Sequence, residues 1–290
     1  MDPIGNFTIR RKAFAMTHPL IKTMKIGFIG AGNMSQTLIK GLIESKLVKP
    51  EQLYASNRTP GKLLKLKEQY KIHTTEINQD VVEECDIVII GVKPQDLESA
   101  MEDVAGGFRE EQIIISLAGG ITFSKLSKMI PNGRLVRLMP NTPSLIGRGV
   151  IGLLSQDNDE SVEDIVQDLF SHLGFVLKVE NEDQFDALMV SCSSGTGFVF
   201  EMMLYWQDWI QEHGFSPEES RKMTIETFLG ASLLAAQSAG VDIEELQSRV
   251  TSKKGITAAG LNSMRELEIE RALRISFEKA AMRSQEISRQ

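Results

Sequence analysis

The glycine loop "GFIGAGNMS", Gly27 to Ser35, constrains the fold of this chain more than any other stretch. The preceding run "KIGFIG" predicts a β-strand, and "NMSQTLIKGLIES" predicts a helix because apolar residues recur every four positions. Gly30 and Gly32 allow the backbone to turn tightly and to approach a pyrophosphate, and Ser35 is small enough for close helix packing. A strand, a glycine loop and a helix in this order indicate a dinucleotide-binding unit.

The pattern after the loop repeats this alternation. Four further runs, each bounded by Gly, Pro or Asn, predict parallel strands: "QLYAS", "DIVIIGV", "QIIISLA" and "RLVRLM". After one last strand-like run, "GFVLKV", the strands stop near Asp183 and long helical patterns follow. We therefore predict an α/β protein, in which a Rossmann-type doubly wound parallel sheet in residues 24–182 precedes an all-α domain in residues 183–290.

The first 23 residues contain an Arg-Arg-Lys cluster but no continuous apolar core and no small-residue cleavage site. This is not the pattern of a secretory signal. We interpret residues 1–23 as a disordered leader outside the fold.

Composition excludes several classes of function. A net charge of -7 argues against nucleic-acid binding, which needs a clustered basic surface. Cys85 and Cys192 lie far apart without a metal-ligand pattern, so no metal site is predicted and a cytoplasmic location fits best. No apolar run reaches the roughly 18 residues of a membrane span, so no membrane association is predicted.

The helical half contains many large apolar residues in a short stretch, which includes Phe198, Phe200, Met202, Met203, Trp206 and Trp209. Such helices are apolar around much of their circumference and should be buried on more than one side. A partner subunit is one way to bury them, and an ordinary core is the other.

The end of the second predicted strand indicates which dinucleotide binds. NAD enzymes usually carry an acid there for the ribose 2'-hydroxyl, whereas NADP enzymes need donors and an arginine for the 2'-phosphate. This chain has Ser56, Asn57 and Arg58 at that position. A guanidinium can bind a phosphate with paired hydrogen bonds, so the sequence favours NADPH, with NADH as a weaker alternative.

Other candidate residues follow later strands, because ligands of open α/β sheets bind at the carboxyl ends of strands. Lys93 is a proton donor, an anion contact or a solvated turn residue. Asn141, in the Pro-rich loop "RLMPNTPSLIG", offers neutral hydrogen bonds to a flat ring. The four histidines have no motif neighbours, which places hydrolysis and phosphoryl transfer behind redox chemistry.

The order of these motifs resembles that of the pyrroline-5-carboxylate reductase family, from Met24 nearly to the C-terminus. The resemblance is carried by the glycine loop, the Asn57-Arg58 pair, the segment Val92 to Pro94, Arg137 with Met139 to Pro143, and the loop "VTSKKGITAAGL", Val250 to Leu261. It implies NADPH-dependent reduction of the cyclic imine 1-pyrroline-5-carboxylate to proline. It also implies a helical domain that forms a homodimer, and larger rings in some members.

The resemblance assigns the site residues. Those expected at the cofactor are Gly30, Gly32, Asn33, Met34, Ser56, Asn57, Arg58, Asn78, Val92, Lys93, Pro94, Ala118 and Asn141. Those expected at the substrate are Ser252, Gly255 and Thr257, with Arg249 beside them. Thr257 would be the catalytic contact to the ring nitrogen.

Two departures from the family pattern fall in the helical half. Lys253 and Lys254 stand where the family usually has Pro-Gly, and Ser193 and Thr196 replace Gly and Pro at the start of a long helix. A lysine pair could reshape an amide pocket or add charge to a carboxylate site. The alternatives are therefore a reductase of another cyclic imine and a non-catalytic relative that binds NADPH and acts through a protein partner. A hydroxy-acid dehydrogenase of similar two-domain plan ranks lower. Such an enzyme would typically need a catalytic lysine early in the helical domain, and no lysine lies between Asp183 and Trp209.

Overall fold

The computed structural model describes residues 18–102 and 104–289. The chain divides into two compact units, Met1–Ser193 with Ser284–Gln290, and Ser194–Arg283. Most of the predicted leader, residues 1–17, lies outside the described residues. Residues 18–23 differ from the prediction, because Pro19–Lys22 form a 3-10 helix, η1, whose Ile21 is fully buried. The apolar side chain of Ile21 packs against the core of the sheet, and the Gln52 amide donates to its carbonyl at 3.1 Å.

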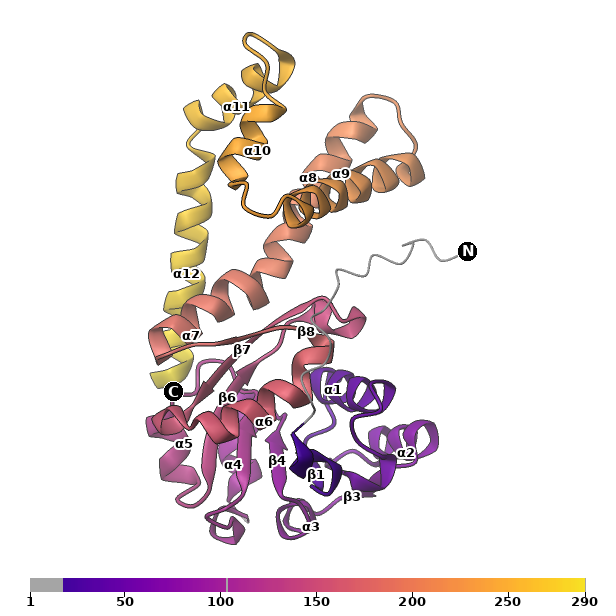
Figure 1. Cartoon of the computed structure of the whole chain (residues 1–290), viewed down its shortest axis with the longest axis vertical. Coiled ribbons are helices and arrows are strands. Elements are labelled where there is room, and N and C mark those ends of the chain that lie inside the picture. The colour runs from indigo at the N-terminus through magenta and orange to yellow at the C-terminus, as the bar shows by residue number, and fades with distance from the viewer. Residues whose placement is uncertain (1–17, 103, 290) are drawn as a thin grey trace. The chain divides into compact units, whose positions relative to one another are not determined.

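The larger unit is built on an eight-stranded sheet in the order β3-β2-β1-β4-β5-β6-β7-β8 (Figure 1). Its strands are β1 Ile26–Ile29, β2 Leu53–Ser56, β3 His73–Thr75, β4 Ile87–Ile90, β5 Ile113–Ser116, β6 Arg134–Met139, β7 Gly149–Ser155 and β8 Gly174–Lys178. Strands β1 to β6 are mutually parallel. The order reverses between β1 and β4, which is where open sheets of this kind bind ligands.

Helices cover both faces of this sheet, because alternate side chains of each strand point to opposite faces. The helices of this unit are α1 Asn33–Glu44, α2 Pro60–Tyr70, α3 Asn78–Glu84, α4 Leu97–Met101, α5 Phe123–Met129, α6 Glu160–Phe170 and α7 Glu182–Leu188. One core cluster joins α1, α2 and α6 to side chains such as Ile87 and Ile89. The other joins α3, α4 and α5 to Val88 and Ile90. The predicted doubly wound fold is confirmed.

Two strands were not predicted, and one of them changes the sheet. β3 is only three residues long and polar, so it carries no strand pattern. β7 runs antiparallel to β6. Nine residues, 140–148, separate these strands, too few for the helical crossover that a parallel connection needs. After β7 the helix α6 does provide a crossover, and β8 pairs with β7 in parallel. The sheet is therefore mixed rather than wholly parallel.

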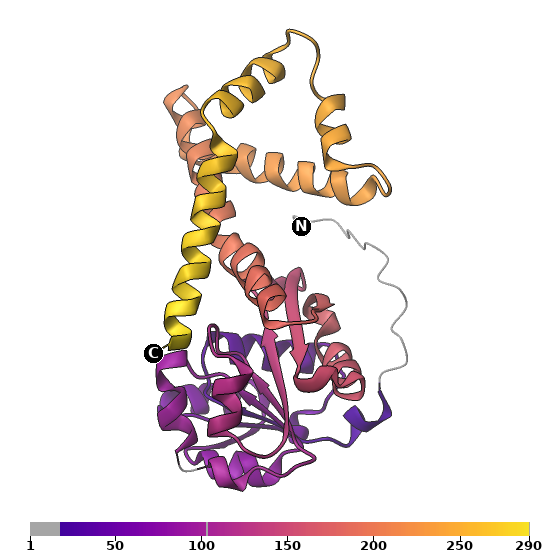
Figure 2. The same ribbon diagram turned by 90° about the vertical axis from the view of Figure 1, so that its left-hand side faces the viewer.

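The second unit is helical throughout its described length. Its helices are α8 Gly195–Glu212, α9 Pro217–Gln237, α10 Ile243–Arg249, α11 Ile256–Glu266 and most of α12, Ile269–Arg289 (Figure 2). Aromatic rings connect them: Trp206 meets Phe228 edge-on and Phe198 lies near Phe277, each pair with centroids 5.5 Å apart. An all-α second half, as predicted from the loss of strand patterns near Asp183, is confirmed.

The predicted burial of the aromatic stretch is not achieved within one chain. Phe200 is 58% exposed, Trp206 44% and Trp209 62%. Exposed clusters of large apolar side chains often mark interaction sites. The sequence leaves open whether an ordinary core or a partner subunit covers these side chains, and the single chain leaves them largely uncovered.

Candidate functional site

A cavity of about 670 Å³ lies at the carboxyl ends of β1, β2 and β4. This is the reversal point of the strand order, where the ends of neighbouring loops diverge and leave room for a ligand. Seven of the predicted cofactor residues line it: Gly30, Gly32, Asn57, Arg58, Asn78, Val92 and Lys93. Four separate segments of the sequence therefore meet at this cavity.

The glycine loop is shaped by close backbone packing. Gly30 has φ +97°, and a Cβ there would lie 2.8 Å from Val92 Cγ1. A Cβ on Gly91, at the end of β4, would lie 2.1 Å from the Ser35 hydroxyl. Neither position has room for a side chain, so the loops after β1 and β4 approach each other as bare backbone, and a ligand can approach the backbone in turn.

The N-terminus of α1 suits an anion. Gly32 occupies the N-cap position and offers no side-chain cap to the first-turn amides. The buried Ser35 hydroxyl has no hydrogen-bond partner among the described residues. Free N–H groups and the positive end of a 12-residue helix favour a phosphate group here. These residues fit the pyrophosphate of a dinucleotide.

An amide network behind the cavity fixes the loops. The Asn57 side chain accepts a hydrogen bond from Ala31 N at 3.1 Å and donates to the Thr59 carbonyl at 3.1 Å. The buried Ser56 hydroxyl donates to Asn78 Oδ1 at 2.7 Å. Asn78 in turn donates to the Ala100 carbonyl at 3.2 Å. Ser56 thus positions Asn78 from behind the cavity wall rather than lining the cavity.

Charged side chains from several segments line the cavity. Arg58 pairs with Asp96, Nη2 to Oδ1 3.1 Å, and Lys62, Lys93 and Glu76 also line the walls. The sequence did not identify Lys62 or Asp96. Lys62 lies in the first turn of α2, four residues after Arg58, and a second cation so close to the end of β2 was the available signal. The only sequence feature that could have identified Asp96 was its position in the turn after β4, which forms the 3-10 helix η3, Pro94–Asp96.

The remaining predicted cofactor residues lie outside the cavity wall. Asn33 and Met34 lie in the first turn of α1, Pro94 opens η3, and Ala118 is buried after β5. Asn141 is buried and holds structure together: it donates to the Cys192 carbonyl at 3.1 Å and accepts from Val150 N at 2.9 Å. Both of its polar ends are therefore engaged by the protein.

The predicted substrate loop lies in the helical unit and opens α11. Lys254 has φ +60°, the left-handed conformation that glycine adopts at no cost. The lysine thus keeps a backbone shape typical of glycine. Gly255 is the N-cap of α11, and a Cβ there would lie 2.2 Å from the Ser252 hydroxyl. The loop therefore has a defined turn ending at free helix amides.

The polar side chains around this turn are accessible. Ser252 and Thr257 are exposed, with Thr257 in the first turn of α11. The predicted substrate residue Arg249 forms an ion pair with Glu245, Nη2 to Oε1 2.6 Å. This pair lies on one helix, α10, and both side chains are more than half exposed. Such a pair is weak, so Arg249 can exchange its partner for another carboxylate.

A buried arginine connects the sheet to α7. Arg137, in β6, donates to Glu182 Oε1 at 3.2 Å, and its Nη2 lies 3.5 Å from Asp186 Oδ1. Its guanidinium packs over the Phe185 ring at 4.2 Å. Burial lowers the pKa of Arg137 and raises the pKa of Asp186, while their mutual attraction opposes both shifts. Glu182 also accepts from Phe123 N at 2.6 Å and so fixes the start of α5.

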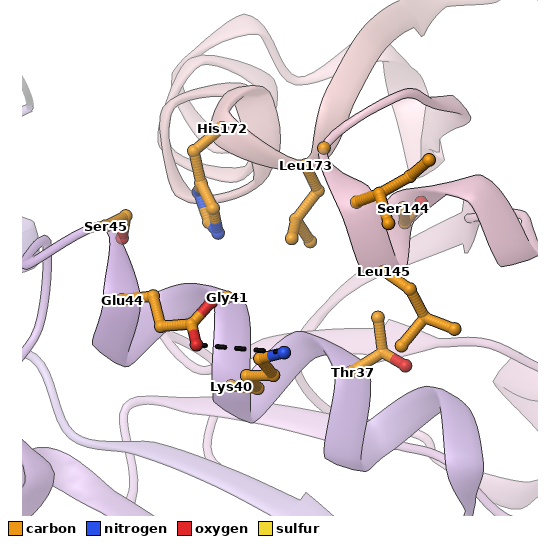
Figure 3. A pocket seen from close by; sticks show the side chains of 11 residues that line it. Thr37, Lys40, Gly41, Glu44, Ser45, Ser144, Leu145, His172 and Leu173 are labelled. Carbon is orange, nitrogen blue, oxygen red and sulfur yellow. Dashed lines mark ion pairs between the residues drawn. The ribbon is translucent and has the colours of Figure 1, made fainter. Parts of the chain in front are cut away.

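A second cavity, of about 390 Å³, lies beside the C-terminal half of α1 (Figure 3). It is lined by α1, by the 3-10 helix η5 Thr142–Ile146 and by η7 Ser171–Leu173. Lys40 and Glu44, one turn apart on α1, form an ion pair of 3.8 Å at its edge (Figure 3). It contains none of the predicted site residues and no strand end, so we assign the cofactor to the larger cavity.

Comparison with known families divides the chain in the same order. Residues 25–120 match the family model described as NADP oxidoreductase, coenzyme F420-dependent. Residues 182–287 match the model of the pyrroline-5-carboxylate reductase dimerisation domain. Contrary to the expectation from the sequence, one run, Glu182–Glu212, is long and apolar enough, by length and composition alone, to cross a membrane. The whole run lies within the match to the dimerisation model, and this match supports oligomerisation through the helical domain.

Whole-chain relatives agree with these matches. A pyrroline-5-carboxylate reductase of Pseudomonas aeruginosa is 33% identical over 272 residues, which are 93% of this chain and 99% of that protein. One of Methanosarcina acetivorans is 31% identical and is covered completely. The solved pyrroline-5-carboxylate reductase of Coxiella burnetii superposes with a TM-score of 0.84 at 29% identity, over 92% of this chain and 99% of that one. A solved Plasmodium falciparum pyrroline carboxylate reductase with NADP bound has a TM-score of 0.82 at 24% identity, over the same shares.

Proposed function

The chain belongs to the pyrroline-5-carboxylate reductase family, and on that basis we propose that it reduces 1-pyrroline-5-carboxylate to proline with NADPH. The observation that carries the proposal is the 33% identity to a reductase of this name over 99% of that enzyme's length. The match includes both halves of the chain. An activity that needs a cofactor domain and a helical domain together is therefore supported by a single alignment.

The choice of NADPH follows from the cavity. The first-turn amides of α1 would hold the pyrophosphate, and Arg58, with Lys62 nearby in sequence, would hold the 2'-phosphate. A guanidinium adds more to the binding of a phosphate dianion than to that of a neutral hydroxyl. We therefore propose that NADPH binds more tightly than NADH. The NADP-bound relative from Plasmodium falciparum is consistent with this order.

The reaction needs little acid–base machinery from the protein. The bound cofactor supplies a hydride, and a protonated cyclic imine is already an electrophile that accepts it at carbon. What the chain contributes is position and a polar environment. We propose that Thr257 hydrogen-bonds the ring nitrogen as it becomes an amine, and that Ser252, Gly255 and Arg249 contact the substrate. The free amides at the start of α11 are suitable donors for its carboxylate.

We propose a homodimer through the helical unit, with larger rings built from dimers. The exposed aromatic side chains of α8, together with the dimerisation match over residues 182–287, support this assembly. A cytoplasmic location is proposed on the cysteines. Cys85 and Cys192 lie far apart in the sequence without a disulfide or metal-ligand pattern, which fits a reducing compartment.

The test is to mix the purified protein with NADPH and 1-pyrroline-5-carboxylate, and to follow both the loss of reduced nicotinamide absorbance and the formation of proline. NADH at the same concentration gives the cofactor preference in parallel. Size-exclusion chromatography with light scattering gives the oligomeric state.

Proline formed in a one-to-one ratio with oxidised cofactor is the expected result. NADPH binding without turnover would overturn the reductase proposal. It would favour a different imine or a non-catalytic relative, for which the Lys253-Lys254 departure is the structural reason. Other cyclic imines tested under the same conditions separate these two outcomes.

A further inference from the structure

The ion pair between Arg58 and Asp96 joins two loops that are 38 residues apart. Arg58 follows β2, and Asp96 ends η3 after β4. Their Nη2 and Oδ1 atoms lie 3.1 Å apart, both residues line the larger cavity, and the Arg58 side chain is 77% exposed. The guanidinium proposed to bind the 2'-phosphate is therefore already occupied by a carboxylate of the protein.

The side chain of Asp96 does not cap the helix that it precedes. It directly precedes α4, where an acid often accepts hydrogen bonds from the first-turn amides. Its side chain makes no such cap, and its carboxylate turns to Arg58 instead. The backbone of Asp96 is held separately, by a hydrogen bond from its N–H to the Lys93 carbonyl at 2.9 Å. Removing the carboxylate charge should leave the turn intact.

An acid beside Arg58 repels a phosphate group that binds there. NAD enzymes place an acid at the end of the second strand to accept from the ribose hydroxyl and repel the 2'-phosphate. This chain has no acid at the end of β2. The fold instead brings Asp96, in the turn after β4, to the guanidinium of Arg58, which follows β2. The charged residues that line the cavity are the cations Arg58, Lys62 and Lys93 and the acids Glu76 and Asp96.

We propose that Asp96 limits the preference for NADPH over NADH, because its carboxylate competes with the 2'-phosphate of NADPH for the Arg58 guanidinium. The inference rests on the proposed function, since it takes Arg58 as the 2'-phosphate contact. In the absence of cofactor Asp96 holds Arg58 over the cavity. When NADPH binds, the phosphate replaces the carboxylate, and the nearby negative charge of Asp96 weakens the complex. NADH carries no 2'-phosphate and avoids this competition.

The test is Asp96→Asn, because the amide keeps a hydrogen-bond acceptor for Arg58 and removes the charge. Dissociation constants for NADPH and NADH are measured by equilibrium fluorescence titration without substrate, at low and high ionic strength. Glu98→Gln is the matched control: it removes the same charge two residues along, from an exposed side chain that does not line the cavity. Asp96→Ser is a second variant that removes the acceptor geometry as well.

We expect D96N to lower the dissociation constant of NADPH about threefold to tenfold and to leave that of NADH unchanged or higher. Most of the gain for NADPH should be lost at high salt. The Glu98→Gln control should change neither dissociation constant. In an Arg58→Ala background the effect of D96N on the NADPH-to-NADH ratio should fall below about twofold.

An equal change for both cofactors, or an unchanged ratio in both Asp96 variants, would overturn this inference and leave the proposed function standing. A wild-type protein that binds neither dinucleotide would overturn the proposed function and the inference together. Because the titrations contain no imine, failure to reduce pyrroline-5-carboxylate does not affect the result.

Discussion

Asn57 Oδ1 accepts a hydrogen bond from Ala31 N at 3.1 Å, and so connects the end of β2 to the glycine loop after β1. The amide end of the same side chain donates to the Thr59 carbonyl. One side chain thus orders both the loop proposed for the pyrophosphate and the turn that carries Arg58.

Asn57→Ala should weaken NADPH and NADH alike, by about threefold to tenfold, because the loss of a loop-ordering hydrogen bond affects the part common to both cofactors. Fluorescence titration with each dinucleotide measures this. A loss confined to NADPH would show that Asn57 acts on the 2'-phosphate instead.

Arg58→Ala should weaken NADPH about tenfold to a hundredfold while changing NADH by less than about threefold, since a charge-assisted contact to a phosphate is removed. The comparison of the two dissociation constants is the measurement. Lys67→Ala, an exposed cation on α2 that does not line the cavity, is the control for net charge. Equal losses for both cofactors would contradict the 2'-phosphate assignment.

Thr257→Ala should lower turnover about tenfold or more and leave the dissociation constant of NADPH unchanged, because the hydroxyl is proposed to contact only the reacting nitrogen. Steady-state kinetics and cofactor titration together measure this. Thr251→Ala is a control, since that hydroxyl donates to the carbonyl of Gln247 in α10 at 2.7 Å. Unchanged turnover in Thr257→Ala would remove the catalytic role.

Arg137→Ala should destabilise the protein by about 3 kcal/mol, because it leaves Glu182 and Asp186 without their cation and opens a void over Phe185. Urea unfolding monitored by tryptophan fluorescence measures the free energy. Lys128→Ala, at an exposed position on α5, should change it by less than about 0.5 kcal/mol. A similar small change for Arg137 would mean that the buried pair contributes nothing net.

The pair of Asp159 with Arg134 predicts an acid-dependent loss of stability. Asp159 caps α6, and hydrogen bonding from Arg134 holds the pKa of its carboxyl below the usual range. A folded pKa below the unfolded one means that the stabilisation is complete above the unfolded pKa. It is lost as the pH falls through the folded pKa.

Asp159→Asn should therefore cost about 0.5 to 1 kcal/mol at neutral pH, a small value because the pair is partly exposed. The difference from wild type should shrink as the pH falls below about 4. Unfolding free energies measured across this range test the prediction, with Glu160→Gln as a neighbouring acid control. A difference that is constant with pH would show that charge plays no part.

Local sequence patterns determined most of this protein. The glycine loop after β1, the alternation of strands and helices and the loss of strands near Asp183 each follow from the periodicity of neighbouring residues, so the fold class could be predicted. The loop ends that carry Gly30, Asn57 and Lys93 could be predicted too, since parallel strands bring their carboxyl ends to one edge. Lys254 was recognised as a departure, but its left-handed backbone was not readable from its identity.

The tertiary structure decided what depends on residues distant in the chain. β7 is antiparallel because its connection to β6 is too short for a crossover, and Arg137 pairs with Glu182 and Asp186 because β6 and α7 pack together. Asp96 meets Arg58 only because β2 and β4 flank β1 in the sheet. Side-chain pairing across such separations depends on strand order and register, and no local pattern in the sequence encodes it.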